Sequence, residues 1–211
     1  MVRSNRKRFL DKDPGKDPPI KLPLISKDTL MLKQAISSAK KHGIKLKAGT
    51  LNKADGNCAI ESAILNLNDR DCFGEKLTFS VDYYRRIWAT DMKNRTLHDE
   101  TWKIYSTQEW EDGWRSMMES GAYERGVFGD LMLLAIACGT KKFILIFNTH
   151  PDSPHDPIYV CDPRKFGVEP DSDIPIVLAY DLSHYESLHT AHNEDTLATI
   201  SLVKSYLEEH I

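Results

Sequence analysis

The sequence predicts an α+β fold in which a small central β-sheet is flanked by helices. Segments with helical periodicity occupy the first two thirds of the chain, whereas apolar segments of strand length are concentrated after residue 142. With 211 residues, 41% of them hydrophobic, the chain is long enough to form one well-buried core with extensions. Because helices and strands occupy largely separate parts of the sequence, we expect an α+β arrangement.

The first helix is expected to begin near Lys27 and to end at Gly43, with Leu32, Ile36 and Ala39 on one face. Further helices are expected over residues 58–68, 81–92, 102–118 and 131–137. A last helix is expected where Asp195 can cap it, with Ile200, Val203 and Leu207 on its apolar face.

Strands are expected over residues 142–148, 157–162 and 174–181, and a final strand is expected to carry His184. The run from Ile174 to Tyr180 is almost entirely apolar, which is typical of a strand buried on both faces. The sheet is therefore expected to form from the C-terminal third of the chain.

The most informative motif is the run Asp55-Gly56-Asn57-Cys58, which is followed at once by an apolar, helix-forming stretch. Gly56 allows a backbone turn that other residues resist, and Asp and Asn are residues that cap helices and stabilise turns. Cys58 is therefore expected in the first turn of a helix, where unpaired N–H groups and the helix dipole stabilise a thiolate and an oxyanion. Taken alone, Cys58 also fits a buried structural cysteine, so a catalytic role requires a base.

His184 is the histidine best placed to be that base, although the chain has eight. It follows the predicted buried strand and lies 126 residues after Cys58. A position on a strand gives the imidazole a fixed direction, and Glu186, two residues later, lies on the same face of that strand. A carboxylate there can accept a hydrogen bond from the far ring nitrogen and stabilise the imidazolium.

These segments together resemble the ovarian tumour (OTU) family of papain-like cysteine proteases, most of which remove ubiquitin. The resemblance rests on the Asp-Gly-Asn-Cys run with its apolar helix and on the late His-Tyr-Glu triplet. Residues 117–123, 128–130 and 131–137 look like the family's Met-containing helix, aromatic-Gly loop and Ala-rich helix, and residues 143–147 like its central strand. The resemblance covers residues 51–189, about two thirds of the chain, and implies the papain-like OTU fold.

Carried over residue by residue, the resemblance implies that Cys58 is the nucleophile and that His184 is the general base and acid. It assigns Asp55 to the loop that shapes the oxyanion hole. It assigns Glu186 to the position where many members have Asp or Asn, which orients the histidine. Tyr185 is implied to line the channel for the C-terminus of ubiquitin. No metal ion takes part in this chemistry.

The function implied is that of a deubiquitinating cysteine protease, which hydrolyses isopeptide bonds between the ubiquitin C-terminus and lysine in ubiquitin chains or conjugates. The chain departs from the family pattern at Ala59-Ile60, where Leu-Phe is commoner, and it lacks the usual Trp-Gly-Gly before the Ala-rich helix. These departures bear on the subfamily to which the chain belongs and on the ubiquitin linkage that it prefers, more than on the chemistry. Two alternatives are a non-catalytic ubiquitin-binding module and a protease acting on another ubiquitin-like modifier.

Composition argues against several other classes. The four cysteines form no CxxC or Cys/His metal-binding spacing, so neither a metal site nor a cofactor is expected. No apolar run approaches the ~18–20 residues of a transmembrane helix, and the basic N-terminus lacks the apolar core of a signal peptide. A cytoplasmic protein is therefore expected.

Three regions are expected along the chain: a flexible basic arm (1–23), a helical extension (24–50) and an OTU-like catalytic domain with a C-terminal helix (51–211). Residues 1–53 carry 14 Lys and Arg against 4 Asp and Glu, and the remaining residues carry 14 against 27. An acidic domain suits the basic C-terminal tail of ubiquitin. The basic arm is a candidate for contact with an anionic partner, although a solvated tail is the simpler interpretation.

Overall fold

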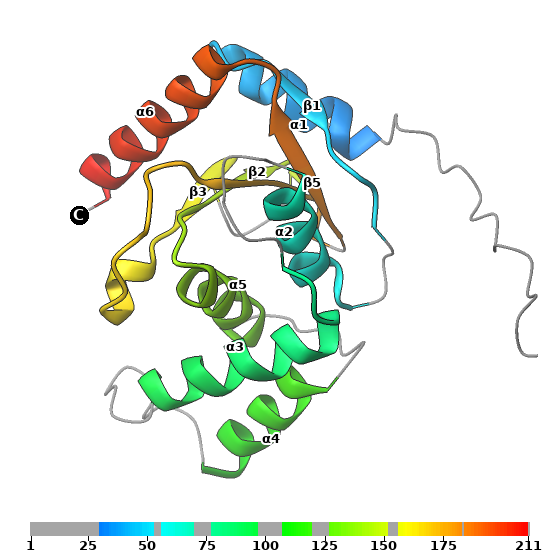
Figure 1. Ribbon diagram of the computed structural model, residues 1–211, viewed down its shortest axis with the longest axis vertical. Helices are drawn as coiled ribbons and strands as arrows, with labels where there is room; N and C mark the ends of the chain where they lie inside the picture. Colours follow the sequence, from blue (N-terminus) through cyan, green and yellow to red (C-terminus); the bar gives the residue numbers. More distant parts are fainter. Residues whose placement is uncertain are drawn as a thin grey trace, which may run out of the picture.

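A five-stranded mixed β-sheet lies at the centre of the computed structural model, with helices on both faces (Figure 1). The structure describes residues 30–52, 56–69, 77–96, 107–119, 127–151, 156–182 and 184–210. The expected basic arm (1–23) and the candidate residue Asp55 lie outside the described residues. The predicted α+β class is confirmed.

The helices are α1 (Leu30–Lys41), α2 (Cys58–Asn68), α3 (Val81–Thr96), α4 (Thr107–Met118), α5 (Val127–Thr140) and α6 (Asn193–Glu209), with a short 3₁₀ helix η3 (Pro163–Phe166). The strands are β1 (Leu46–Ala48), β2 (Ile144–Asn148), β3 (Ile158–Cys161), β4 (Ile176–Tyr180) and β5 (Tyr185–Thr190).

The strands lie in the order β1-β5-β4-β2-β3. β2 and β4 run parallel, and the other three pairs are antiparallel. β5 is thus an interior strand, flanked by β1 and β4. The edge strand β1 was not expected, because three residues are too few to show a periodic pattern, and its pairing with β5 defines it.

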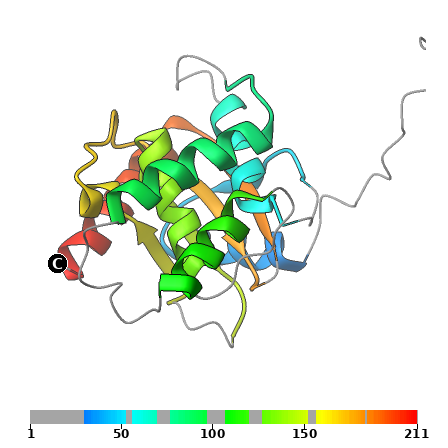
Figure 2. The same cartoon turned by 90° about the horizontal axis from the view of Figure 1, so that it is seen from below.

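Successive residues of the central strands face opposite sides of the sheet, and each side has its own hydrophobic core. Ile144, Ile146 and Leu178 point into the core shared with α2, α3, α4 and α5. Leu145 and Val177 point into the core shared with α1 and α6. Figure 2 views the molecule from the side covered by α3, α4 and α5. Both faces of the sheet are covered, which explains why these strands are apolar without alternation.

Residues 30–48 of the expected N-terminal extension lie on the side of the sheet that α1 and α6 cover, or form its edge. Leu32, Ala35 and Ala39 of α1 are buried in the core that lies between the sheet and α6, and β1 forms the sheet edge. The predicted helix stop at Gly43 has a backbone φ of +74°, a conformation that glycine adopts without strain. The boundary expected between residues 50 and 51 stays a prediction.

Three elements differ from the sequence expectations in detail. α6 begins at Asn193, so Asp195 is not the cap residue; its carboxylate instead accepts hydrogen bonds from the backbone N–H groups of His192 (3.1 Å) and Lys45 (2.8 Å). β5 begins at Tyr185, one residue after His184. α4 begins at Thr107, and the earlier part of the expected helix over residues 102–118 lies outside the described residues.

α2 is held on the sheet by a buried amide as well as by apolar contacts. Asn66 is fully buried, and its Nδ2 donates hydrogen bonds to the backbone carbonyls of Val177 in β4 (3.1 Å) and Leu188 in β5 (2.6 Å). A buried amide that loses such partners costs about 1–3 kcal/mol, so these bonds favour one position of α2 along the sheet.

Within the described residues, no helix is both long enough and apolar enough to span a lipid bilayer.

The packing of α5 on α3 requires a residue without a side chain at position 139. A Cβ added to Gly139 would lie 2.1 Å from Cδ1 of Trp88, whose ring is buried in the core. Gly→Ala inside a helix normally stabilises by about 1 kcal/mol. We expect Gly139→Ala to destabilise the protein by about 1–3 kcal/mol instead, because the Trp88 ring must move within a packed core. Chemical denaturation measures the free energy of unfolding.

Ser37→Ala, at an exposed position of α1, is the matched control and is expected to change stability by a few tenths of a kcal/mol in the stabilising direction. A Gly139→Ala protein as stable as the parent or more so would contradict the described α3–α5 contact.

Candidate active site

Cys58 is the first residue of α2, as the sequence predicts. The first N–H groups of a helix have no acceptor within the helix, so the backbone around Cys58 presents donors at the same place as the thiol. The cysteine itself is 4% exposed, and it forms no disulfide. Gly56, two residues earlier, has a φ of +82°, which accounts for the glycine in the motif.

Asn57 occupies the N-cap position of α2 but does not cap the helix with its side chain. Its Oδ1 instead accepts a hydrogen bond of 2.8 Å from Nε of Arg85 in α3. Asn57 therefore stands at the helix start, as its residue type favours, but its side chain bonds to Arg85 and not to the helix. The reason is the buried arginine, which competes for the same side-chain oxygen and lies 28 residues away in the sequence.

His184 lies at the end of the hairpin that joins β4 to β5. Its backbone N–H donates a hydrogen bond of 2.9 Å to Oδ1 of Asp181, and its carbonyl accepts one of 3.3 Å from the Asp181 N–H. Leu182, between them, has a φ of +72°, which is uncommon for a residue with a branched side chain. This closed turn fixes the backbone of His184 directly before β5.

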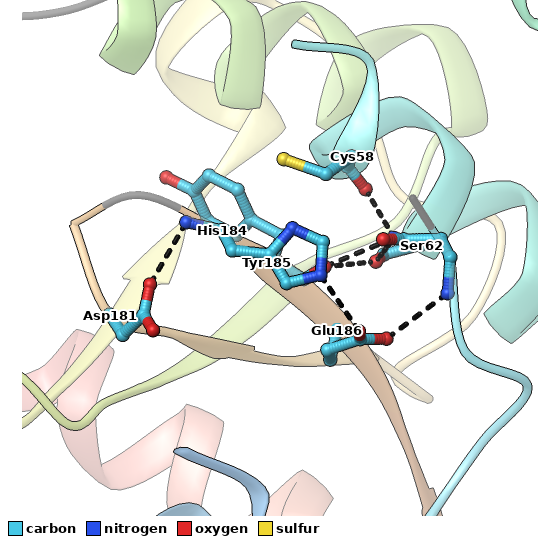
Figure 3. A network of polar contacts seen from close by, with 7 residues as sticks. Cys58, Ser62, Asp181, His184, Tyr185 and Glu186 are labelled. Carbon is cyan, nitrogen blue, oxygen red and sulfur yellow. Dashed lines mark hydrogen bonds and ion pairs between the residues drawn. The ribbon is translucent and has the colours of Figure 1, made fainter. Parts of the chain in front are cut away.

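The ring of His184 lies between the side chains of Cys58 and Glu186 (Figure 3). Its Nε2 is 2.7 Å from Oε1 of Glu186, and both side chains are largely buried, with 16% and 5% exposed. The other ring nitrogen, Nδ1, is buried without a hydrogen-bond partner in the part of the chain that the structure describes, and it is on the side of the ring that faces Cys58. Catalytic contacts are often longer without substrate and tighten when it binds.

The surroundings of His184 favour its protonated form. Burial alone would lower the pKa of His184, because it disfavours a charged ring. The nearby Cys58 and the Glu186 carboxylate act in the opposite direction and together raise the pKa of His184 from 6.5 to about 10. At neutral pH the ring is therefore an imidazolium, with the sulfur of Cys58 on one side and the Glu186 carboxylate on the other.

Asn52 joins the two segments that carry Cys58 and His184. Its Nδ2 donates to the backbone carbonyl of Cys58 (2.9 Å) and to that of Tyr185 (3.0 Å), and its backbone N–H lies 3.4 Å from Oε2 of Glu186. Ser62 of α2 donates a second hydrogen bond, of 2.9 Å, to the same Tyr185 carbonyl. The start of α2 and the start of β5 are thus connected through buried polar groups.

The side chain of Tyr185 lies on the opposite face of the strand from His184 and Glu186. Its ring stacks on that of Tyr180, with ring centroids 4.4 Å apart, and packs against the core that contains α5. Its carbonyl, rather than its ring, takes part in the contacts between α2 and β5. The expected channel-lining role of Tyr185 stays a prediction, as does the role of Asp55.

Four residues of this arrangement were missed by sequence reasoning: Asn52, Ser62, Arg85 and Asp181. Asp181 has a local signal, since an aspartate directly after a strand is typical of a turn. The helical period places Arg85 on the apolar face of α3, but its partner Asn57 is 28 residues away, and the shared partner of Asn52 and Ser62, Tyr185, is more than 120 residues away. Among the described residues, no group of three or more His, Cys, Asp or Glu is arranged to hold a metal ion.

The fold is similar to those of solved OTU domains. The OTU domain of OTUD1 matches with a TM-score of 0.50 at 12% identity, over 75% of this chain and 94% of that domain. The chain has the OTU fold. This confirms the fold that the resemblance implies, and at this level of identity the likeness concerns the fold alone.

Two further structures show weaker similarity to this OTU-fold chain. The viral OTU domain protease from Taggert virus has a TM-score of 0.48 at 14% identity, over 70% of this chain and 81% of its own. An OTU domain in complex with ubiquitin has a TM-score of 0.48 at 15% identity, over 78% of this chain and 88% of its own. No protein-family model matches the sequence. No curated protein is significantly similar to it.

Titration of His184 by NMR tests the electrostatics of the site. We expect the ring to titrate with a midpoint near pH 10 and expect the midpoint to fall by at least one unit in Cys58→Ala, because the contact with Cys58 is the larger of the two that raise the pKa. Because the pKa is 6.5 when the chain is unfolded, stabilisation by the imidazolium is complete below pH 6.5. It is lost as the pH rises through about 10.

A folded Cys138→Ala protein is the control, because it removes a buried thiol from α5 and leaves the ring of His184 untouched. A midpoint near 6.5 in the parent protein, or one that Cys58→Ala leaves unchanged, would contradict the described contacts of His184.

Proposed function

We propose that the protein is a deubiquitinating cysteine protease that hydrolyses the isopeptide bond between the C-terminus of ubiquitin and a lysine of its conjugates. The observation that carries the proposal is the position of the His184 ring between Cys58 and Glu186, on a chain with the OTU fold. A thiol at a helix start, an imidazolium beside it and a buried carboxylate behind the ring form the set of groups that thiol proteases require.

In the first half of the reaction, the proton of the Cys58 thiol resides on His184, and the resulting thiolate attacks the carbonyl carbon of the terminal glycine of ubiquitin. The carbonyl oxygen becomes an oxyanion, which the backbone N–H groups at the start of α2 stabilise. As the carbon–nitrogen bond breaks, the His184 imidazolium gives its proton to the departing lysine amine. The products are the free lysine side chain and a thioester between ubiquitin and Cys58.

In the second half, water attacks the thioester carbonyl, and neutral His184 accepts a proton from that water. The carbon–sulfur bond breaks, the thiolate returns and ubiquitin leaves with a free carboxylate. General acid–base catalysis of this kind contributes roughly 10²–10⁴-fold in rate.

Glu186 is proposed to orient the His184 ring and to stabilise its charge. Its Oε1 accepts from Nε2 of His184, and its other oxygen lies near the N–H of Asn52, so the carboxylate is held from both ends. Glu186 in place of the commoner Asp or Asn is compatible with this role, since its longer side chain reaches the ring at 2.7 Å.

The remaining expectations belong to the same proposal. Asp55 would contribute to the oxyanion loop and Tyr185 to the channel for the ubiquitin tail, while the basic arm would serve an anionic partner. A cytoplasmic place of action is part of the proposal, because a reducing compartment keeps a catalytic thiol free of disulfides.

Incubation with diubiquitins of every linkage tests the proposal and identifies the preferred linkage. We expect the parent protein to cleave at least one linkage and expect Cys58→Ala and His184→Gln to lose cleavage by at least roughly 10²-fold, because each removes a reacting group. Cys58→Ala should keep its affinity for ubiquitin, since the fold and the docking surface remain. Gel analysis of the products over time gives the rates.

His42→Gln, at an exposed position after α1, is the matched control for His184→Gln and should cleave at the parent rate. Cleavage by a folded Cys58→Ala protein would refute the nucleophile assignment. Binding of ubiquitin without any cleavage would favour the binding-module alternative, and cleavage only of another ubiquitin-like modifier would favour a different substrate.

A further inference from the structure

Arg85 is a fully buried arginine in contact with the loop that precedes Cys58. The side chain comes from the second turn of α3 and is 1% exposed. We propose that Arg85 is a positioning residue for the reaction: it holds the Gly56–Asn57 backbone so that the N–H groups before Cys58 face the oxyanion. The catalytic part of this inference rests on the proposed function, whereas the hydrogen bonds of Arg85 are features of the structure whatever the function.

All three types of nitrogen in the guanidinium group are used. Nε donates to Oδ1 of Asn57 (2.8 Å), Nη2 to the carbonyl of Gly56 (2.6 Å), and Nη1 to the carbonyl of Met117 (2.8 Å). Two of these acceptors belong to adjacent residues of the catalytic loop, so one planar and rigid donor group forms hydrogen bonds to the loop at two points. The third acceptor is in the last turn of α4.

The bond to the Gly56 carbonyl determines where the next N–H group points. The peptide bonds of the described chain include no cis form, and in a trans peptide the carbonyl and the following N–H point in opposite directions. With the Gly56 carbonyl directed at Arg85, the N–H of Asn57 must point away from α3. Rotation of this peptide plane would break the bond to Nη2.

The backbone angles given for the loop are compatible with an anion-binding shape. Gly56 has a φ of +82°, and Asn57 has a φ of −99° and a ψ of −1°. Successive residues that alternate between left-handed and right-handed conformations can turn their N–H groups toward a common point, an arrangement called a nest, and the positive φ of Gly56 before the right-handed Asn57 is compatible with it. The oxyanion of the reaction is an anion that forms beside Cys58, the next residue. Arg85 therefore holds, from the α3 side, the backbone proposed to receive this charge.

The third hydrogen bond of Arg85 connects it to the end of α4. The last carbonyls of a helix have no partner within the helix, and that of Met117 is satisfied by Nη1 of Arg85. A cation at this end of a helix also interacts favourably with the helix dipole. The guanidinium thus contacts α4 on one side and the catalytic loop on the other.

Lysine cannot replace this arrangement. An ammonium group keeps the charge but lacks the flat fork that reaches Gly56 and Asn57 simultaneously. A residue that merely filled space or supplied charge would be replaced by lysine at little cost to the reaction. If Arg85 holds the loop, replacing it with lysine should lower the turnover rate of the enzyme. Substrate binding should remain, because it depends on the outer surface.

The test compares Arg85→Lys with Arg86→Lys, since Arg86 is the next residue and its side chain is exposed. The first measurement is kcat and KM for a fluorogenic amide at the C-terminus of ubiquitin. We expect Arg85→Lys to lower kcat by roughly 100-fold, the scale of losing one oxyanion donor, with KM within about twofold of the parent value. Arg86→Lys should match the parent in both.

The second measurement needs no substrate: amide hydrogen exchange of residues 56–58 in each variant. Arg85→Lys should speed exchange in this loop at least about tenfold while β2 and β4 keep the parent rates, and Arg86→Lys should change neither. If Arg85→Lys does not fold, Asn57→Ala takes its place, because it removes the Nε acceptor and leaves the arginine. Like Arg85→Lys, Asn57→Ala should lower kcat and speed the amide hydrogen exchange of residues 56–58.

The two measurements separate the two proposals. Parent-like kcat, or parent-like exchange of residues 56–58, in a folded Arg85→Lys protein overturns the positioning role. An equal loss of stability throughout the sheet and the loop also overturns it, since Arg85 would then be a general packing residue. If the parent protein does not act on ubiquitin while loop exchange still depends on Arg85, the proposed function fails and the hold on the loop stands.

Discussion

The site depends on how α2 is fixed against β5. Cys58 and His184 are 126 residues apart, and only this contact brings their side chains to one place. Apolar packing alone would tolerate small shifts of a helix on a sheet, but buried hydrogen bonds do not, because each lost partner costs about 1–3 kcal/mol. Asn52 ties the carbonyl of Cys58 to that of Tyr185, and Asn66 ties the other end of α2 to β4 and β5. The amides fix the helix at both ends.

The same constraint sets the electrostatics. Once α2 and β5 are in register, the His184 ring has a carboxylate on one side and a thiol group on the other, and their effect on its pKa exceeds that of burial. Burying an unpaired charge is costly, so a ring this enclosed can remain charged only with such partners. The charged ring supplies the proton that the proposed leaving group needs. Structure and reactivity therefore follow from one packing arrangement.

Much of the fold and the core of the site could be predicted from local sequence. The glycine before Cys58 indicates a turn, the apolar run after it a helix, and the run before His184 a buried strand, and all three are present. Glu186 could be placed near the ring because residues two apart on a strand share a face.

The missing parts are those that depend on distant contacts. The helical period places Arg85 on the apolar face of α3 and Arg86 off it. Nothing in the sequence indicates that the partners of Arg85 are Gly56 and Asn57. Asn52 lies in a loop, where an asparagine is ordinary. Asn57 occupies the N-cap position, but its side chain bonds to a buried guanidinium 28 residues away, which local preference does not indicate. Long-range hydrogen bonds have no periodic signature in a sequence.

The central claim is that Cys58, and no other cysteine, is the nucleophile toward the C-terminus of ubiquitin. The most direct measurement is to incubate the parent protein with ubiquitin carrying a C-terminal electrophile and to map the modified residue by mass spectrometry. The account predicts one adduct per chain, on Cys58, with none on Cys138 or Cys161, because burial raises the pKa of both of these thiols. An adduct on another cysteine, or none on a folded protein that binds ubiquitin, would contradict it.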